Sequence, residues 1–223
     1  MKNIKISPSL MCANFLDLKS DLDIFREESI DYLHIDIMDG HYVPNFTLGI
    51  DFCRAVHGYS EIPLDIHLMI ENADRYAVDF ASFDGAIITI HPETCSHPIR
   101  TLQEIKARGV RAGVAVDPAM PIESIRHLVP LLDMVCVMTV NPGYAGQALA
   151  PGMIGKIAET AAFLEKAGFE GEIEVDGNVS WENIPRMLDA GGEVLVTGTS
   201  SIFEKSSDLR TNIIRLRKML GAR

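Results

Sequence analysis

Residues 32–40 read YLHIDIMDG, a short apolar run that is interrupted by His34 and Asp36 and ends at a glycine. A run of this length with a glycine at its end predicts a buried β-strand. Successive side chains of a strand point to opposite faces, so His34, Asp36 and Met38 share one face. An aspartate inside an apolar strand is costly unless it is paired or coordinated. This strand is therefore expected to be part of the core and also to carry residues that could act in catalysis or bind a ligand.

Similar short apolar runs recur along the whole chain and alternate with longer amphipathic stretches. We expect strands at Lys5–Leu10, Tyr32–Met38, Leu64–Met69, Ala86–His91, Arg111–Val116, Met134–Val140, Glu172–Val175 and Val194–Thr197. We expect helices at Leu16–Glu28, Ala73–Ser82, Ile99–Arg108, Ile122–Val129, Met153–Ala167, Trp181–Ala190 and Asp208–Met219. Strands that alternate with helices predict a parallel sheet covered on both faces, and eight such units close into a barrel.

The fold class that we predict is therefore α/β, with residues 1–223 forming a single (β/α)8 TIM barrel that is one catalytic domain. The alternative is a doubly wound sheet, which would carry a G-x-G-x-x-G turn after its first strand. Residues 8–11 read PSLM and offer no such turn.

The composition and net charge of the chain limit the kinds of binding partner that we expect. The net charge is −11 and 47% of the 223 residues are hydrophobic. Such an acidic chain is not expected to bind nucleic acid or an anionic membrane surface. No secretory signal is visible, and the apolar stretch Leu131–Val140 is too short to span a bilayer. The four cysteines form no C-x-x-C pair, so we expect reduced thiols and a cytoplasmic location.

Polar residues at other strand ends extend the pattern of the first motif. The expected strand Leu64–Met69 carries His67, and Asp176 follows the strand Glu172–Val175. Catalytic groups of a barrel sit at the carboxyl ends of its strands, so two imidazoles and two carboxylates can converge at one mouth. Imidazole suits Zn, Fe or Ni, and carboxylate extends the choice to Mn. Taken alone, each of these two histidines is more often an ordinary core residue than a ligand.

Glycine-rich turns follow the last three expected strands, at residues 141–147, 177–178 and 198–201. Glycine lets the backbone approach an anion closely, and the loops after strands seven and eight are the recurrent phosphate site of this barrel. Each turn alone is typical of any loop, but three around one mouth indicate a phosphate-binding site.

Two long motifs carry a resemblance to a known family. Residues 34–45, HIDIMDGHYVPN, and residues 137–147, VMTVNPGYAGQ, resemble the two signatures of the ribulose-phosphate 3-epimerase family. Residues 7–9, 64–69 and 174–177 match it in order, so the resemblance covers nearly the whole chain.

The resemblance implies a metal-dependent epimerase. One divalent ion, with Zn²⁺ preferred over Fe²⁺, Mn²⁺ or Co²⁺, would be bound by His34, Asp36, His67 and Asp176. Asp36 would remove the C3 proton to give a cis-enediolate, and Asp176 would return a proton to the other face. A homo-oligomer, either dimer or hexamer, is implied. The substrate contacts implied are Ser9, Met38, His67, Met69, Met138, Gly143, Tyr144, Ala145, Gly146, Gly177, Asn178, Gly198 and Thr199.

Several positions depart from the common family pattern, among them Cys12, Ala145 and Asn178. These departures resemble the allulose-6-phosphate 3-epimerase branch, so the substrate that we expect is D-allulose 6-phosphate, converted to D-fructose 6-phosphate. The alternative is D-ribulose 5-phosphate, converted to D-xylulose 5-phosphate. A phosphate-binding barrel without turnover is the non-enzyme alternative. The roles of His91, Glu93, Asp65 and Glu174 stay open.

Overall fold

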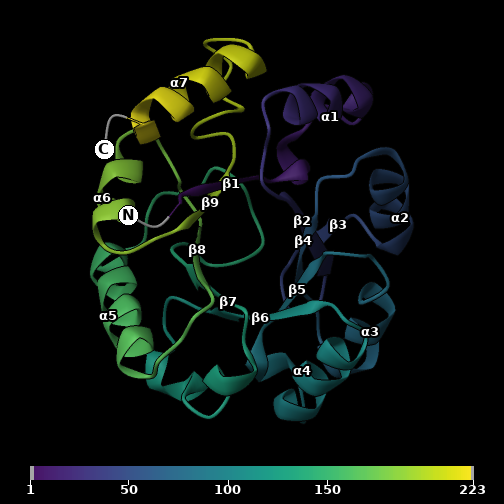
Figure 1. Cartoon of the computed structure of the whole chain (residues 1–223), viewed down its shortest axis with the longest axis vertical. Helices are drawn as coiled ribbons and strands as arrows, with labels where there is room; N and C mark the ends of the chain where they lie inside the picture. Colours follow the sequence, from purple (N-terminus) through teal and green to yellow (C-terminus); the bar gives the residue numbers. More distant parts are fainter. Residues whose placement is uncertain (1–2, 222–223) are drawn as a thin grey trace.

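The computed structural model describes residues 3–221, and at its centre eight parallel strands form a ring (Figure 1). These strands are β1 (Lys5–Pro8), β2 (Leu33–Asp39), β4 (Leu64–Met69), β5 (Ile87–Ile90), β6 (Arg111–Val116), β7 (Met134–Met138), β8 (Glu172–Asp176) and β9 (Val194–Thr197). Each pairs with its neighbour in the order β1-β9-β8-β7-β6-β5-β4-β2. The ring closes between β1 and β2, where Ser9 forms a parallel bridge with His34.

Helices surround the ring on its outside (Figure 1). The α-helices within residues 3–221 are α1 (Leu18–Glu27), α2 (Ile50–Tyr59), α3 (Ala73–Phe80), α4 (Pro98–Ala107), α5 (Met153–Lys166), α6 (Asn183–Asp189) and α7 (Leu209–Gly221). This arrangement confirms the predicted α/β barrel. Among the helices of these residues, none is both long enough and apolar enough to cross a membrane.

The alternation of side chains along β2 and β4 is as predicted. Ile35 and Ile37 of β2, and Ile66 of β4, belong to the main apolar core between the strands and the surrounding helices. The residues of opposite parity, including Asp36 and His67, face the inside of the ring and are buried there. The outer face of these strands is therefore packed by apolar residues, and the inner face carries polar groups.

The predicted helix Ile122–Val129 is wrong. Two 3-10 segments, η3 (Ile122–Ile125) and η4 (Val129–Leu131), occupy this connection after β6. Pro121 precedes the first segment and Pro130 lies within the second. Pro130 lacks an N–H donor and disfavours helical backbone at Val129, so an α-helix cannot continue past the end of this stretch.

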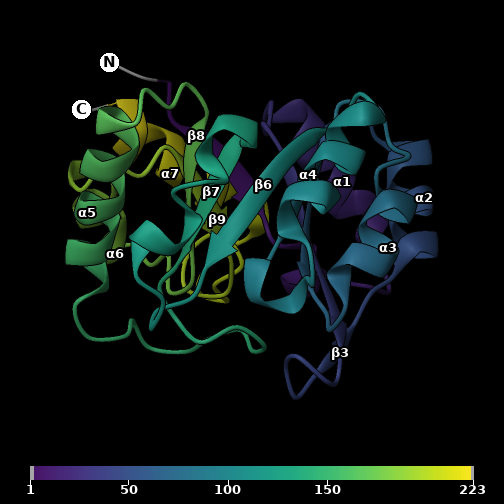
Figure 2. The ribbon, with the colours of Figure 1, turned by 90° about the horizontal axis from the view of Figure 1, so that it is seen from below.

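Helix α2 (Ile50–Tyr59) and strand β3 were not predicted, and both follow β2. Helix α2 buries only Cys53 and Val56, so its apolar stripe is narrow. Strand β3 (Phe46–Thr47) is short and pairs antiparallel with the end of β2. Figure 2 shows the turn before β3 projecting from the same end of the barrel as the long loop after β7. These two segments form one rim.

Candidate metal and substrate site

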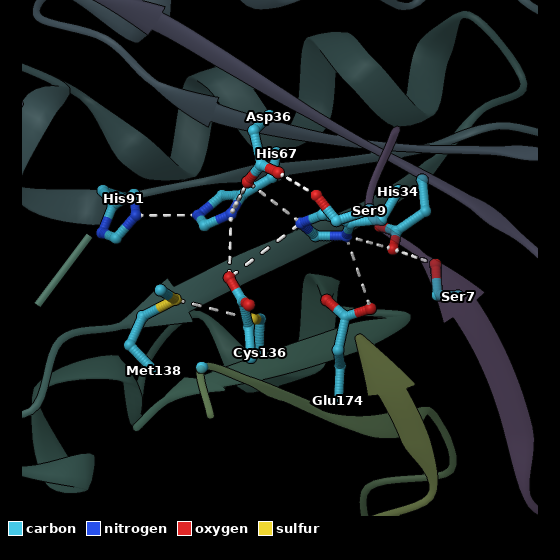
Figure 3. A network of polar contacts seen from close by, with 12 residues as sticks. Ser7, Ser9, His34, Asp36, His67, His91, Cys136, Met138 and Glu174 are labelled. Atoms are coloured by element: carbon cyan, nitrogen blue, oxygen red, sulfur yellow. Dashed lines mark hydrogen bonds and ion pairs between the residues drawn. The ribbon is translucent and has the colours of Figure 1, made fainter. Parts of the chain in front are cut away.

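Four potential ligand atoms from β2, β4 and β8 face one another inside the barrel, all within 4.8 Å of each other. His34 Nε2 lies 3.3 Å from Asp36 Oδ1 and 4.0 Å from Asp176 Oδ2. His67 Nδ1 lies 3.7 Å from each of the same two carboxylate oxygens. Figure 3 shows His34, Asp36 and His67 directed toward one another. The register of β2 and β4, which pairs Asp36 with His67, produces this convergence.

The unsatisfied nitrogens of this group indicate what it can bind. His34 Nε2 and His67 Nδ1 are buried and make no hydrogen bond. A buried polar atom without a partner is rare and calls for an explanation such as a bound ion. Ligands about 2.0–2.1 Å from a tetrahedral Zn²⁺ lie about 3.3–3.4 Å apart. The observed separations of 3.3–4.0 Å are close to that value, so these four residues could hold a divalent metal.

His34 is oriented from behind by an aspartate. Its Nδ1 lies 2.6 Å from Asp65 Oδ2, which also accepts a 2.9 Å hydrogen bond from Ser7 Oγ. The carboxylate fixes Nδ1 as the protonated nitrogen and leaves Nε2 as the free lone pair. Burial opposes a charge on His34, but Asp65 and then Asp36 raise its pKa well above the usual value in the absence of metal.

The two candidate catalytic aspartates have unequal pKa values. Burial opposes ionisation of Asp36, but the adjacent His34 and His67 lower its pKa below the ordinary value. Burial raises the pKa of Asp176 to about 7, where the charge of His34 opposes the rise and that of Asp36 adds to it. Two carboxyl groups whose environments separate their pKa values are suited to acid and base roles at neutral pH.

Beneath His34 lies a second buried carboxyl group whose role the sequence left open. Glu174 is fully buried, and neither of its carboxylate oxygens makes a hydrogen bond. Burial, followed by the charge of Asp65, raises its pKa well above the usual value. Burial therefore favours the protonated form of Glu174. Burial opposes ionisation of Asp65 as well, but the charge of His34 lowers the pKa of Asp65, so Asp65 is the carboxylate that orients His34.

A pocket opens above the four ligands at the rim of the barrel. Its lining includes the predicted residues Ser9, Asp36, Met38, Met69, Met138, Gly143, Tyr144, Ala145, Gly146, Asp176, Gly177, Asn178, Gly198 and Thr199. His34 and His67 are fully buried beneath it. The structure thus gathers every predicted site residue at one place, and it adds Met11, Cys12, Val140, Asn141, Pro142, Gln147, Val179, Val196 and Ser200 to the lining. Most of these additions are sequence neighbours of the predicted motifs, which is the signal that could have found them.

The turns after β7 and β8 hold each other in place at one side of the pocket. Asn178, whose φ is 45°, donates from Nδ2 to the carbonyl oxygen of Gln147 at 2.6 Å. Asn183 Nδ2 donates in turn to Asn178 Oδ1 at 2.7 Å. Asn178 therefore uses its side chain to join two loops.

The turn before β3 and the loop after β7 meet across the rim. Asn45 Nδ2 donates to the carbonyl oxygen of Gly143 at 2.8 Å, and Tyr144 Oη donates to that of Pro44 at 2.6 Å. Tyr144 is thereby placed at the edge of the pocket, with about half of its surface exposed to solvent.

His91 and Glu93 do not line the pocket. His91 lies behind His67, with the two Nε2 atoms 2.9 Å apart. Burial opposes a charge on His91, but Asp117 and Glu93 raise its pKa. His91 therefore contacts a candidate metal ligand, and Glu93 contacts His91.

Comparison of the sequence with known proteins identifies one family. Residues 5–203 match the model of the ribulose-phosphate 3 epimerase family. A ribulose-phosphate 3-epimerase of Bacillus subtilis is 41% identical over 198 residues, which cover 88% of this chain and 91% of that protein. One from Escherichia coli is 38% identical, with 92% and 91% covered, and one from Methanocaldococcus jannaschii is 37% identical, with 96% and 90% covered.

Solved structures of more distant sequence share the fold. A mutant tryptophan synthase alpha-subunit from Pyrococcus furiosus superimposes with a TM-score of 0.71 at 12% identity, covering 98% of this chain and 100% of that one. At this identity the likeness concerns the barrel alone.

Proposed function

This chain belongs to the ribulose-phosphate 3-epimerase family, and we propose that it interconverts D-ribulose 5-phosphate and D-xylulose 5-phosphate at the site between β2, β4 and β8. The observation that carries the proposal is geometric: Asp36 and Asp176 each lie within 4.0 Å of the free ring nitrogens of His34 and His67.

His34, Asp36, His67 and Asp176 would hold one divalent metal, for which we propose Zn²⁺. When bound, the metal would supply Lewis-acid stabilisation of negative charge on the oxygens next to the reacting carbon. Asp36 is the base that removes the C3 proton to leave a cis-enediolate. Asp176 gives a proton to the opposite face, and the roles reverse for the reverse reaction.

The glycine turns would bind the phosphate group. Gly146 and Gly177 have positive φ values of 78° and 108°, a backbone conformation that L side chains rarely adopt, and both line the pocket with Gly198. Such turns can present backbone N–H groups to an anion without obstruction by a side chain. This binding mode needs no lysine, so it is compatible with the acidic charge of the chain.

The comparisons change the length of the substrate that we expect. The departures at Cys12, Ala145 and Asn178 pointed to a six-carbon ketose phosphate. The bacterial and archaeal relatives at 37–41% identity are all named ribulose-phosphate 3-epimerase. We therefore propose the five-carbon substrate, and the six-carbon sugar becomes the comparison in its test.

The test is a measurement of kcat/KM for D-ribulose 5-phosphate and D-allulose 6-phosphate on one preparation of known metal content. We expect the five-carbon substrate to be preferred by about 10–200-fold, the range that one carbon unit provides. A preference for the six-carbon substrate would overturn the assignment of length. Absence of turnover with both, in protein that contains one metal ion and binds phosphate, would overturn the epimerase proposal and favour a binding protein.

A further inference from the structure

We propose that His91, Tyr42 and Glu93 form a directional hydrogen-bond chain that fixes the tautomer of His67, which makes His91 a positioning residue for the metal site. The proposal rests on the metal role proposed above for His67. It concerns residues outside the pocket, and it assigns a role to a cluster that neither contacts the substrate nor supplies a ligand.

The first link joins two buried imidazoles. His91 follows β5 and is fully buried, and its ring is nearly parallel to that of His67, with centroids 5.0 Å apart and planes inclined by 21°. The two Nε2 atoms lie 2.9 Å apart, as the dashed line in Figure 3 shows. One of these nitrogens must donate and the other must accept.

The second link decides which nitrogen donates. Tyr42 Oη lies 2.8 Å from Glu93 Oε1 and 2.9 Å from His91 Nδ1. A tyrosine has a single hydroxyl hydrogen, and an ionised carboxylate can only accept. Burial opposes ionisation of Glu93, but the adjacent His91 lowers its pKa, so the carboxylate is the form present. Tyr42 therefore donates to Glu93 and accepts from His91 Nδ1–H.

The tautomer of His67 follows from these two links. Neutral His91 with its proton on Nδ1 has a lone pair on Nε2, which accepts the Nε2–H of His67. His67 then carries its own lone pair on Nδ1, the nitrogen that faces Asp36 and Asp176 at 3.7 Å. Asp117 Oδ1 makes no hydrogen bond but lies 3.2 Å from His91 Nδ1, so its charge favours a proton on that nitrogen.

The two candidate ligand histidines are thus oriented by different means. His34 contacts a buried carboxylate directly at 2.6 Å. His67 reaches its carboxylate through His91 and Tyr42, and that carboxylate lies near the rim, where the side chain of Glu93 is 30% exposed. Tyr42 also packs against the cluster of Met38, Val43 and Met69. The chain therefore connects the metal site to the rim of the pocket.

The competing arrangement is a doubly protonated His91. It would donate from Nε2, so His67 would have to accept there and carry its proton on Nδ1, which prevents coordination through Nδ1. Nitrogen-15 NMR of histidine-labelled protein distinguishes the two arrangements, because long-range couplings show which ring nitrogens are protonated. We expect a protonated Nε2 on His67 and a protonated Nδ1 with a bare Nε2 on His91, in both metal-free and Zn²⁺-loaded protein. The opposite pattern in the Zn²⁺-loaded protein would overturn the proposal.

Metal affinity provides a second readout, measured by competition of the protein with a chelator for Zn²⁺. We expect His91→Phe to weaken binding about 10–100-fold, as is usual when the hydrogen-bond partner of a ligand histidine is lost. His91→Gln can restore the acceptor and should recover part of that loss. His97→Phe, at an exposed position of the same connection just before α4, is the matched control and should bind as the wild type does.

Tyr42→Phe tests the chain without altering either buried imidazole, and covers the case in which His91→Phe does not fold. We expect a weaker loss of Zn²⁺ affinity than in His91→Phe. Wild-type affinity in a folded His91→Phe protein, or in Tyr42→Phe where only that variant folds, would refute the role of the chain. A wild-type protein that binds no metal would instead refute the proposed function, and the tautomer measurement on metal-free protein would stand independently.

Discussion

Ser9 and Asp36 are joined across the closure of the barrel, where Ser9 Oγ donates a 2.7 Å hydrogen bond to Asp36 Oδ2. This bond occupies one carboxylate oxygen and leaves Oδ1 facing His34 Nε2 at 3.3 Å. Ser9 was expected to contact the substrate, and it does line the pocket. Its position in the structure adds a second role, which is to orient the candidate base.

Ser9→Ala should therefore lower kcat by about 10–100-fold, because the loss of an outer hydrogen bond lets a ligand carboxylate rotate away from its working geometry. Steady-state kinetics on protein of measured metal content provide the test. Ser82→Ala removes a hydroxyl at an exposed site and is the control. Unchanged kcat and metal content in Ser9→Ala would show that Asp36 is held by other contacts.

The two aspartates should be separately indispensable. Asp36→Asn and Asp176→Asn each keep the side-chain shape but remove the proton acceptor, so kcat should fall at least about 10³-fold in both, within the range for loss of an acid or base. Removal of the metal with a chelator should likewise abolish turnover, and added Zn²⁺ should restore it. Asp79→Asn, at an exposed position of α3, should leave kcat and metal content unchanged. Full activity in metal-free protein would contradict the coordination role.

Gly177 is irreplaceable on two grounds that can be measured separately. A Cβ atom at this position would lie 2.6 Å from Val140 Cγ2 and 2.9 Å from its backbone nitrogen, and φ is +108°. Gly177→Ala should therefore cost about 1–3 kcal/mol of stability through backbone strain and raise KM for the sugar phosphate. Gly58→Ala is the control, since a Cβ there meets nothing within 4 Å. A Gly177→Ala protein with wild-type stability and KM would refute both effects.

Local sequence pattern predicted most of the barrel and placed the four candidate ligands on its inner face. The alternation along β2 is a property of any strand, so His34 and Asp36 could be placed on one face before the partner strands were known. The helix expected over residues 122–129 is replaced by two 3-10 segments, and Pro130 in the second prevents an α-helix from continuing beyond them. Helix α2 was not predicted because only two of its residues, Cys53 and Val56, are buried.

The supporting groups of the site could not be predicted because they depend on the register between neighbouring strands. Asp65 contacts His34 from a different strand, and His91 contacts His67 from β5. Such pairs lie at least 24 residues apart in sequence, and their distances follow from the register between strands. That residues 1–223 form one catalytic domain and assemble into a homo-oligomer stays a prediction.

Cys12 lines the pocket and should nonetheless react slowly with alkylating reagents. Burial, followed by the charge of Asp36, raises the pKa of its thiol from 9.0 to about 11. Since the thiolate is the nucleophile, a rise of about two units leaves about a hundredfold less of it at pH 8. Mass spectrometry of iodoacetamide-treated, metal-free protein should show a rate that climbs about tenfold per pH unit up to pH 10. A plateau below pH 9 would show an ordinary thiol.

Lys156 supports the loop after β6 from inside the protein. It is 7% exposed, and its Nζ donates to the carbonyl oxygens of Asp117, Pro118 and Met120. Lys156→Met keeps the length of the side chain but removes the donors, so carbonyl groups lose their partners. Each unsatisfied buried acceptor costs about 1–3 kcal/mol, and water can reach some of these groups.

We therefore expect Lys156→Met to lower the free energy of unfolding by about 1–3 kcal/mol in urea titrations. Lys166→Met, at an exposed position of the same helix, should change it by no more than about 0.5 kcal/mol. Because Asp117 lies 3.2 Å from His91 Nδ1, loosening this loop should also weaken Zn²⁺ binding. If the two variants were equally stable, water would replace the ammonium group as hydrogen-bond donor to these carbonyl oxygens without loss of stability. The loop would then be held by its own backbone.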